Sequence, residues 1–204
     1  MRKIALIAGM LIASYGCAFA MPDRTGKTDV GFQIGGLLQG TEKLDSALYL
    51  GGSAAYGVNE WFAVGLEGGY SDQSTSIPLS GTEQQGKIGR IPLFLDLILR
   101  YTKMPDVNYV PYGVLGLGAL FTDVHGTGTF QSSNLKLDVD NSFAIKMGAG
   151  VDWFINEKWA LGLEASYVWV DSDANVISLS NGRTIDSTNL DYWTLTGGVK
   201  YLFD

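Results

Sequence analysis

The chain has 204 residues, of which 46% are hydrophobic and 17% are charged, and its formal net charge is −7. An acidic chain lacks the basic footprint that nucleic-acid binding requires, so we expect no nucleic-acid partner. Beyond its first twenty residues it has no uncharged apolar run of 18 or more residues, which excludes transmembrane helices and leaves its high apolar content to be explained.

The first twenty residues have the pattern of an export signal. Arg2 and Lys3 give a positive start, residues 4–13 form an uncharged apolar run, and Ala18 and Ala20 place small residues before a cleavage site. A spanning helix needs about 20 apolar residues, so this run is too short to be an anchor. We expect a cleaved signal peptide at residues 1–20. Removing it leaves 12 of the 14 basic residues against 21 acidic ones, a formal charge of −9.

Cys17 is the only cysteine, and it lies inside the expected signal peptide. The mature chain would then have no disulfide and no cysteine metal site. The alternative is a lipoprotein in which Cys17 is acylated and becomes the first residue. The preceding Ser14-Tyr15-Gly16 fits that alternative poorly because of the tyrosine.

Hydrophobicity alternates with a period of two along most of the remaining chain, which indicates strands with two different faces. In residues 159–170, large apolar side chains such as Leu161 and Leu163 alternate with small or charged ones such as Gly162 and Glu164. Eight such segments are predicted, near residues 28–40, 47–57, 61–71, 88–102, 110–122, 142–154, 159–171 and 190–203.

The connections between the predicted strands alternate in length. Residues 57–60, 103–109 and 155–158 are short, whereas residues 72–87, 123–141 and 172–189 are long and polar; only the connection at 41–46 is brief at the same end. Short periplasmic turns and long extracellular loops are typical of outer-membrane barrels. The sequence therefore predicts that residues 21–204 form one all-β domain, an eight-stranded, up-and-down, antiparallel transmembrane β-barrel.

An internal repeat supports the strand count. Residues 58–70 align without gaps to residues 155–167, and seven of the thirteen positions are identical at a spacing of 97 residues. Four strands fill that spacing, so we expect the second and third strands and the sixth and seventh strands to form equivalent hairpins on opposite sides of the wall. Shared constraints on all such hairpins would give the same match without any duplication.

Aromatic residues gather where the predicted strands meet turns or loops, as expected of side chains that lie at the lipid headgroup level. The expected periplasmic belt contains Tyr56, Trp61, Tyr101, Tyr112, Trp153, Trp159 and Tyr201, and the outer belt contains Tyr70, Phe121, Phe143, Trp169 and Trp193. In a soluble sandwich most of these side chains would instead belong to the core.

Charged residues recur on the face that would point into the lumen. They are Glu67, Asp96, Arg100, Lys146, Asp152, Glu164 and Lys200. Eight strands leave an interior about wide enough to be filled by side chains, so these charges must pair with one another or with trapped water. A salt-bridged plug and a narrow solute path gated by the pairs both remain open. A lipocalin-like carrier would have an apolar interior, so the charges argue against it.

The last predicted strand carries a pattern of its own. Its end reads Thr196-Gly197-Gly198-Val199-Lys200-Tyr201-Leu202-Phe203. Gly198, Tyr201 and Phe203 resemble the closing-strand signal of bacterial outer-membrane proteins, although the usual chain stops at the aromatic and here Asp204 follows. The resemblance implies recognition by the barrel-assembly machinery.

Residues 28–203 as a whole resemble the small bacterial outer-membrane β-barrel superfamily, which includes the OmpX, OmpA-barrel and OmpW groups. Residues 110–118 are similar to a proline-tyrosine-glycine strand common in these proteins, and residues 163–167 with Asp171 and Asp173 resemble the OmpW group in particular. The resemblance implies a place in the outer membrane of a Gram-negative cell, with the lipid bilayer and lipopolysaccharide as partners.

Candidate catalytic residues are few. His125 is the only histidine, and it falls in the loop at residues 123–141 with Ser132 and Ser133. Some outer-membrane barrels are lipid-modifying enzymes with serine and histidine on the wall. Because no positioned carboxylate partner accompanies these residues, we expect that the protein is not an enzyme.

Two acidic pairs could hold calcium, Asp138/Asp140 and Asp171/Asp173. Neither has the glycine and the spaced oxygen ligands of a dedicated calcium loop, so we expect neither a metal nor a cofactor. Two function classes remain open. One is a porin-like barrel that passes or binds small molecules, hydrophobic ones included, as in the OmpW group. The other is a non-conducting barrel that acts in surface interaction, adhesion or envelope integrity.

Overall fold

The computed structural model describes residues 22–39, 46–79, 82–102, 108–126, 135–138, 141–171, 173–178 and 184–204. The expected signal peptide lies outside these residues. In the described part of the chain, no helix is long and apolar enough to cross a membrane.

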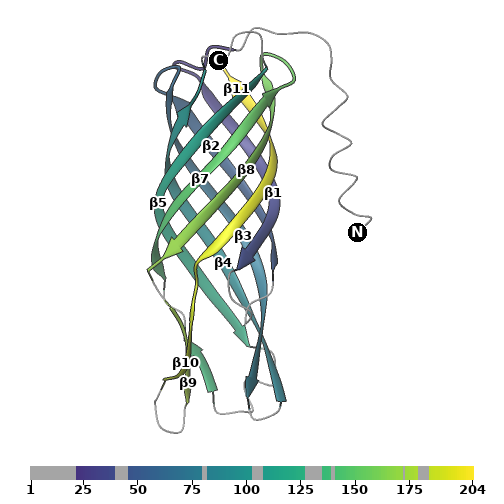
Figure 1. Cartoon of the computed structure of the whole chain (residues 1–204), viewed down its shortest axis with the longest axis vertical. Coiled ribbons are helices and arrows are strands. Elements are labelled where there is room, and N and C mark those ends of the chain that lie inside the picture. The colour runs from purple at the N-terminus through teal and green to yellow at the C-terminus, as the bar shows by residue number, and fades with distance from the viewer. Residues whose placement is uncertain are drawn as a thin grey trace, which may run out of the picture.

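Eight strands close into one elongated antiparallel barrel (Figure 1). They are β1 (Thr28–Gln39), β2 (Ala47–Gly57), β3 (Phe62–Leu79), β4 (Thr82–Arg100), β5 (Tyr109–Gly126), β7 (Ser142–Phe154), β8 (Trp159–Val170) and β11 (Tyr192–Phe203). Each pairs with the barrel strands before and after it in the chain, and β11 pairs with β1 to close the wall. The eight-stranded, up-and-down barrel predicted from the sequence is confirmed.

The wall has two chemically different faces because its side chains alternate. On β8, Leu161 and Leu163 are 42% and 53% exposed, whereas Ala160 and Ser166 are 1% exposed each. The outward face carries most of the large aliphatic and aromatic residues, which meet lipid. The inward face carries small, polar and charged residues together with one apolar cluster. Much of the high apolar content of the chain therefore belongs to the outside of the molecule.

The internal repeat corresponds to two matching periplasmic turns. Between β2 and β3, the side chain of Asn59 accepts hydrogen bonds from the backbone N–H groups of Trp61 (2.8 Å) and Phe62 (2.9 Å). Between β7 and β8, Asn156 accepts from Lys158 and Trp159, both at 2.9 Å. Asparagine favours such turns because its side chain can bond the backbone two residues on. The two hairpins lie on opposite sides of the barrel, as the spacing predicted.

The prediction that residues 72–87 and 123–141 are loops was wrong in part. β3 and β4 remain paired as far as Leu79 and Thr82, and β5 continues to Gly126. The barrel wall has already fixed the register of these strands, so continuing them adds paired residues without closing a new loop. Polar sequence beyond the membrane can therefore extend a strand even where the alternation fades.

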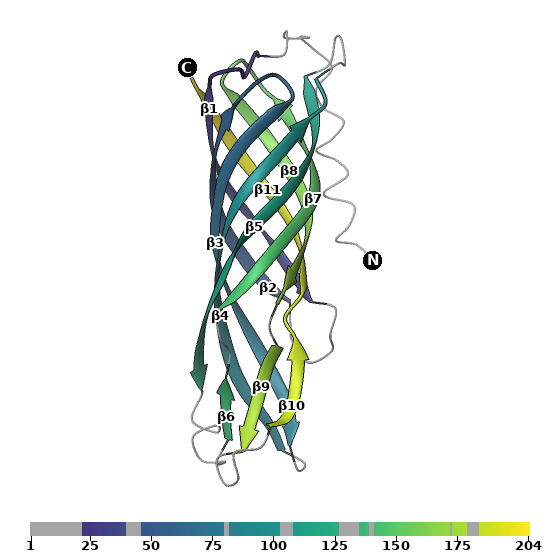
Figure 2. The ribbon, with the colours of Figure 1, turned by 90° about the vertical axis from the view of Figure 1, so that its left-hand side faces the viewer.

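A second, smaller sheet lies beyond the extracellular end of the barrel. It consists of β6 (Leu135–Asp138), β9 (Asp173–Ser178) and β10 (Thr184–Asn189), in the order β10–β9–β6. Figure 2 shows these strands beside the extended β3–β4 hairpin, at the end opposite the C-terminus. The predicted loops at 123–141 and 172–189 therefore meet in one sheet.

Candidate functional site

The lumen has two parts of different chemistry. The part near the extracellular strand ends, here called the outer half, is an apolar cluster of residues that are each at most 8% exposed: Leu37, Ala47, Phe94, Leu120, Ala144, Val168, Val170, Leu190 and Tyr192. Arg90 is also buried there, with its guanidinium 5.6 Å from the ring centroid of Tyr192. The part nearer the periplasmic turns, here called the inner half, contains two groups of charged residues.

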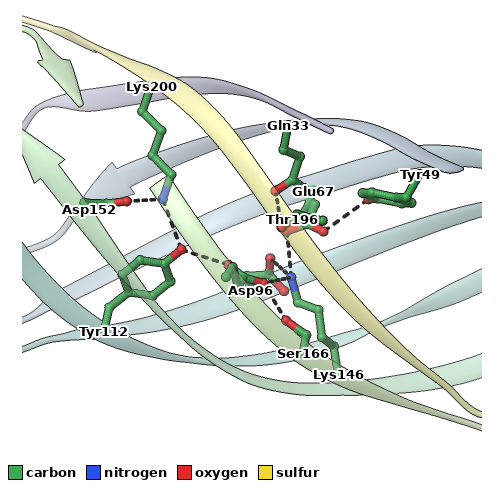
Figure 3. Close-up of polar contacts among 11 residues, drawn as sticks. Gln33, Tyr49, Glu67, Asp96, Tyr112, Lys146, Asp152, Ser166, Thr196 and Lys200 are labelled. Carbon is green, nitrogen blue, oxygen red and sulfur yellow. Dashed lines mark hydrogen bonds and ion pairs between the residues drawn. The ribbon is translucent and has the colours of Figure 1, made fainter. Parts of the chain in front are cut away.

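Lys146 of β7 is the centre of one charged group in the inner half. Its Nζ lies 2.7 Å from Glu67 Oε2 on β3 and 2.8 Å from Asp96 Oδ2 on β4. Glu164 Oε1 on β8 is 3.8 Å away. The lysine is 2% exposed, so three carboxylates from three other strands meet one buried ammonium group (Figure 3).

Two lumen tyrosines hold the glutamates of this group. Tyr49 donates a hydrogen bond to Glu67 Oε1 (3.3 Å), and Tyr112 donates one to Glu164 Oε2 (3.0 Å). Glu67 and Glu164 occupy equivalent positions in the internal repeat. Glycine at position 69 leaves room for the ring of Tyr49, since an added Cβ would overlap that ring.

A second charged group lies nearer the periplasm. Lys200 Nζ and Arg24 Nη2 contact the two oxygens of Asp152 at 2.8 and 3.0 Å. Arg100 Nη2 contacts Asp29 Oδ2 at 2.7 Å. Both carboxylates and both arginines are nearly inaccessible to solvent, which makes their pairing necessary because an isolated buried charge is very costly.

Tyr112 joins the two groups, because its hydroxyl accepts a hydrogen bond from Lys200 Nζ (3.4 Å) while it donates to Glu164 (Figure 3). The cavity that Tyr112, Glu164 and Lys200 line has a volume of about 10 Å³. That is the space of about one water molecule. Little free space remains beside these three side chains.

All seven charged residues singled out from the sequence point into the lumen. Glu67, Asp96, Lys146 and Glu164 meet in the first group, and Arg100, Asp152 and Lys200 meet in the second. Asp29 and Arg24, which also belong to the second group, were not predicted from the sequence. Asp29 could have been found, since it shares the inward positions of β1 with Gly31 and Gln33. Arg24 precedes β1, where strand alternation gives no signal.

The placement of Tyr112 in the periplasmic aromatic belt was wrong. The residue is 7% exposed and faces the lumen. On β5 it shares its side of the strand with Gly116 and Leu120, whereas Leu115 and Leu117 face lipid. The alternation within that strand predicts that Tyr112 faces inward. The wrong placement came from giving more weight to the general preference of tyrosine for membrane interfaces.

The residues of the predicted assembly signal lie on both faces of β11. Tyr201 and Phe203 face outward with ring centroids 4.7 Å apart, and Gly198 faces inward, where an added Cβ would overlap the backbone of β1. Their recognition by the assembly machinery stays a prediction. Asp204, the departure from the usual signal, contacts Lys27 at 3.0 Å and Lys158 at 3.1 Å. The hydrogen bonds from Lys27 and Lys158 lower the pKa of Asp204.

The candidate catalytic and calcium-binding residues lie largely beyond what the structure describes. Ser132, Ser133 and Asp140 are outside the described residues. His125 belongs to β5 and not to a loop, and for it, Asp138 and Asp173 only the backbone is described. Among the described residues, no group of three or more histidine, cysteine or acidic side chains could hold a metal ion.

Comparison with known proteins shows which family and which solved structures this chain is similar to. Residues 5–203 match the family model described as the outer membrane protein beta-barrel domain. The structure of the outer membrane protein OprG from Pseudomonas aeruginosa is similar, with a TM-score of 0.73 and 17% identity over 89% of this chain and 98% of that one.

Two further solved structures are similar. Neisserial surface protein A has a TM-score of 0.57 and 14% identity, over 86% of this chain and 97% of that one. The outer membrane protein W of E. coli has a TM-score of 0.53 and 19% identity, over 88% of this chain and 99% of that one. These identities are low, so the likeness is one of fold. No curated protein matches the chain.

Proposed function

This chain belongs to the family of outer membrane protein beta-barrel domains, and from that premise we propose that it is a porin-like barrel that passes small apolar molecules. They would bind in the outer half of the lumen and leave sideways into the membrane. The observation that carries the proposal is the change of the inward face from apolar in the outer half to charged in the inner half. A molecule arriving from outside meets a mainly apolar lining first, with Arg90 as the charged residue within it, and the salt bridges second.

The outer half has the lining that a small apolar molecule requires. Leu37, Leu120 and Val168 are each at most 1% exposed, and they come from three different strands around the lumen. Moving apolar surface out of water into such a lining is favourable by roughly 25 cal/mol per Å². Specific polar groups are not needed for this gain, which favours a range of small apolar compounds over one particular ligand.

The inner half opposes passage along the barrel axis. Lys146 and its three carboxylates meet inside the lumen, and separating them would expose uncompensated charges in a medium of low polarity. An apolar molecule offers no hydrogen bond in exchange. The route that costs least from the outer half therefore leads through the wall.

The pairing of strands in the wall is interrupted beside the outer half of the lumen. Pairing between β3 and β4 runs from Phe62 to Gly68, omits the next two pairs, and resumes with Ser71 opposite Arg90. Pro92 lies in the omitted stretch, and proline has no N–H to donate to a neighbouring strand. The other seven strand pairs of the barrel are continuous over their described lengths. Pro92 is two positions from Phe94 of the outer half, so the interruption adjoins the apolar lining.

A matched pair of substitutions tests this route. Val168 and Val110 both face the lumen and are each 1% exposed, but Val168 lies in the outer half and Val110 near the periplasmic end. Entry of an apolar fluorophore would be followed in vesicles whose outer leaflet is lipopolysaccharide. We expect Val168→Thr to slow entry at least threefold and Val110→Thr to leave it unchanged. Pro92→Val, which restores a backbone donor, should also slow entry. Equal rates in all variants would contradict the proposal.

A second candidate function is surface interaction. The observation that favours it is the strand structure beyond the membrane, where β6, β9 and β10 form their own sheet. Structure of this kind is unnecessary for uptake of small molecules. Replacing residues 173–189 by a short Gly-Ser turn should abolish adhesion of whole cells to an immobilised matrix protein if this function holds. Uptake by the same variant should then be unchanged.

A further inference from the structure

We propose that residues 22–27 are a removable plug that closes the periplasmic end of the lumen, and that the buried side chain of Arg24 holds this plug in place. These residues precede β1 and belong to no strand of the wall. These residues would seal the lumen from the periplasm whatever the barrel transports.

The side chain of Arg24 is seated inside the barrel. It is 6% exposed, although it comes from a segment outside the strands. Its Nη2 lies 3.0 Å from Asp152 Oδ2, and its guanidinium lies 4.5 Å from the ring centroid of Phe154. The salt bridge to Asp152 and the cation–π contact with Phe154 hold the guanidinium against the lumen face of β7.

The backbone of the segment is turned back over the end of β2. Gly26 donates a hydrogen bond to the carbonyl oxygen of Gly57 (2.8 Å), and Gly57 donates one to that of Lys27 (2.9 Å). Gly26 has a φ of +73°, which glycine adopts without steric cost. At position 57 an added Cβ would overlap the carbonyl oxygen of Arg24, so only glycine allows the segment to approach this closely.

The ion pairs of the wall are complete without the plug. Asp152 is paired with Lys200 at 2.8 Å, and Asp29 is paired with Arg100 at 2.7 Å. Arg24 is therefore a third cation beside two carboxylates that already have partners. Removing it leaves no buried carboxylate alone, so the plug should leave its seat without unfolding the wall.

The plug lies beside a cavity at the periplasmic end of the barrel. The cavity has a volume of about 190 Å³ and is lined by Arg24 itself, by Asp23 and Glu60, and by the lumen-facing Arg100 and Val110. Beside Tyr112 there is space for about one water molecule. If the signal peptide is cleaved after Ala20 as expected, Arg24 is the fourth residue of the mature chain. A segment that close to a free end can swing out without moving β1.

Thiol labelling of the folded, full-length protein tests the plug. Ala55 faces the lumen, is 4% exposed and lies opposite Asp29 in the β1–β2 pairing. A cysteine at this position, in a Cys17→Ser background, is the only thiol. We expect a cationic, membrane-impermeant thiol reagent to modify it slowly, and Arg24→Ala to accelerate modification at least tenfold. Lys27→Gln changes a charge in the same segment that contacts Asp204 outside the lumen, and it should have no effect.

Unchanged labelling in a folded Arg24→Ala protein would overturn the proposal. A second measurement uses the unmodified chain, so that it stands even if that variant fails to fold. Trypsin must bind the arginine side chain in its own specificity pocket. An Arg24 side chain that is buried in the lumen cannot enter that pocket. Cleavage after Arg24 should therefore be at least tenfold slower in the folded barrel than in urea-unfolded protein. Equal rates would mean that the segment is not seated and would likewise overturn the proposal.

Discussion

The outer and inner halves of the lumen are built by the same strands and held together by different forces. On β7, Ala144 belongs to the apolar outer half, and Lys146, two residues later, is the centre of a buried charged group. The chemistry of the lumen therefore changes along the barrel axis and not from strand to strand. Alternation decides only that a side chain points inward. The height of the residue in the wall decides what it meets there.

The two halves should also fail in different ways. A side chain lost from the outer half leaves a cavity, whose cost depends on how far the neighbours can relax. A partner lost from the inner half leaves a charge without compensation in a medium of low polarity. The inner half should therefore be the less tolerant of substitution, although ion pairs by themselves add little net stability.

The largest effect is expected for Lys146→Met, which removes the cation from the first charged group. Three carboxylates would then be left around an apolar side chain, and we expect the free energy of unfolding to fall by about 4 kcal/mol. Urea unfolding from liposomes measures the change. Adding Glu67→Gln and Asp96→Asn should restore part of the loss. Met147→Leu, on the adjacent lipid-facing position, should cost far less; equal costs would contradict the pairing.

The next largest effect is expected for Leu120→Ala in the outer half. Truncation of this buried leucine should lower the free energy of unfolding by about 3 kcal/mol, because it leaves an apolar cavity. The same cavity should bind a small apolar molecule such as benzene, which would raise the unfolding midpoint when added. Leu202→Ala makes the same change near the periplasmic end and should show no stabilisation by benzene. Stabilisation of both variants by benzene would contradict the proposed difference between the two halves of the lumen.

A smaller effect is expected for Tyr112→Phe, which removes the hydroxyl that joins the two charged groups. We expect a loss of about 1 kcal/mol, the usual scale for one hydrogen bond. In a double-mutant cycle, Tyr112→Phe and Glu164→Gln should not be additive, because they break the same contact. Tyr109→Phe, on the lipid-facing side of β5, serves as the control. Additive losses would mean that the hydroxyl acts elsewhere.

The smallest effect is expected outside the lumen, at Asp204. Hydrogen bonds from Lys27 and Lys158 lower the pKa of this carboxyl group, so its stabilising effect is present at neutral pH. The effect should be lost as the pH falls through that lowered pKa. Asp204→Asn should therefore lower the urea midpoint slightly at pH 7 and not at all in strong acid. A difference that persists in acid would indicate another cause.

Much of the fold could be predicted from the sequence because strand alternation is a local property. The eight strands were placed to within a few residues at their periplasmic ends, and the repeated Asn59 and Asn156 turns appeared where the internal match put them. The extracellular ends were less predictable. Outside the membrane both faces of a strand can be polar, so residues 72–87 showed too little contrast to be recognised as paired.

The sequence by itself determined that this chain forms a lipid-facing barrel and that seven of its charged residues point inward, since both follow from the period of two. It could not determine their partners. Lys146 meets Glu67 from a strand on the other side of the lumen, 79 residues away, and only the closure and register of the wall bring them to one height. The seat of Arg24 likewise exists only once β7 and the end of β2 have been brought together. Contacts across a lumen depend on tertiary structure because no local pattern records how far one strand is shifted against another.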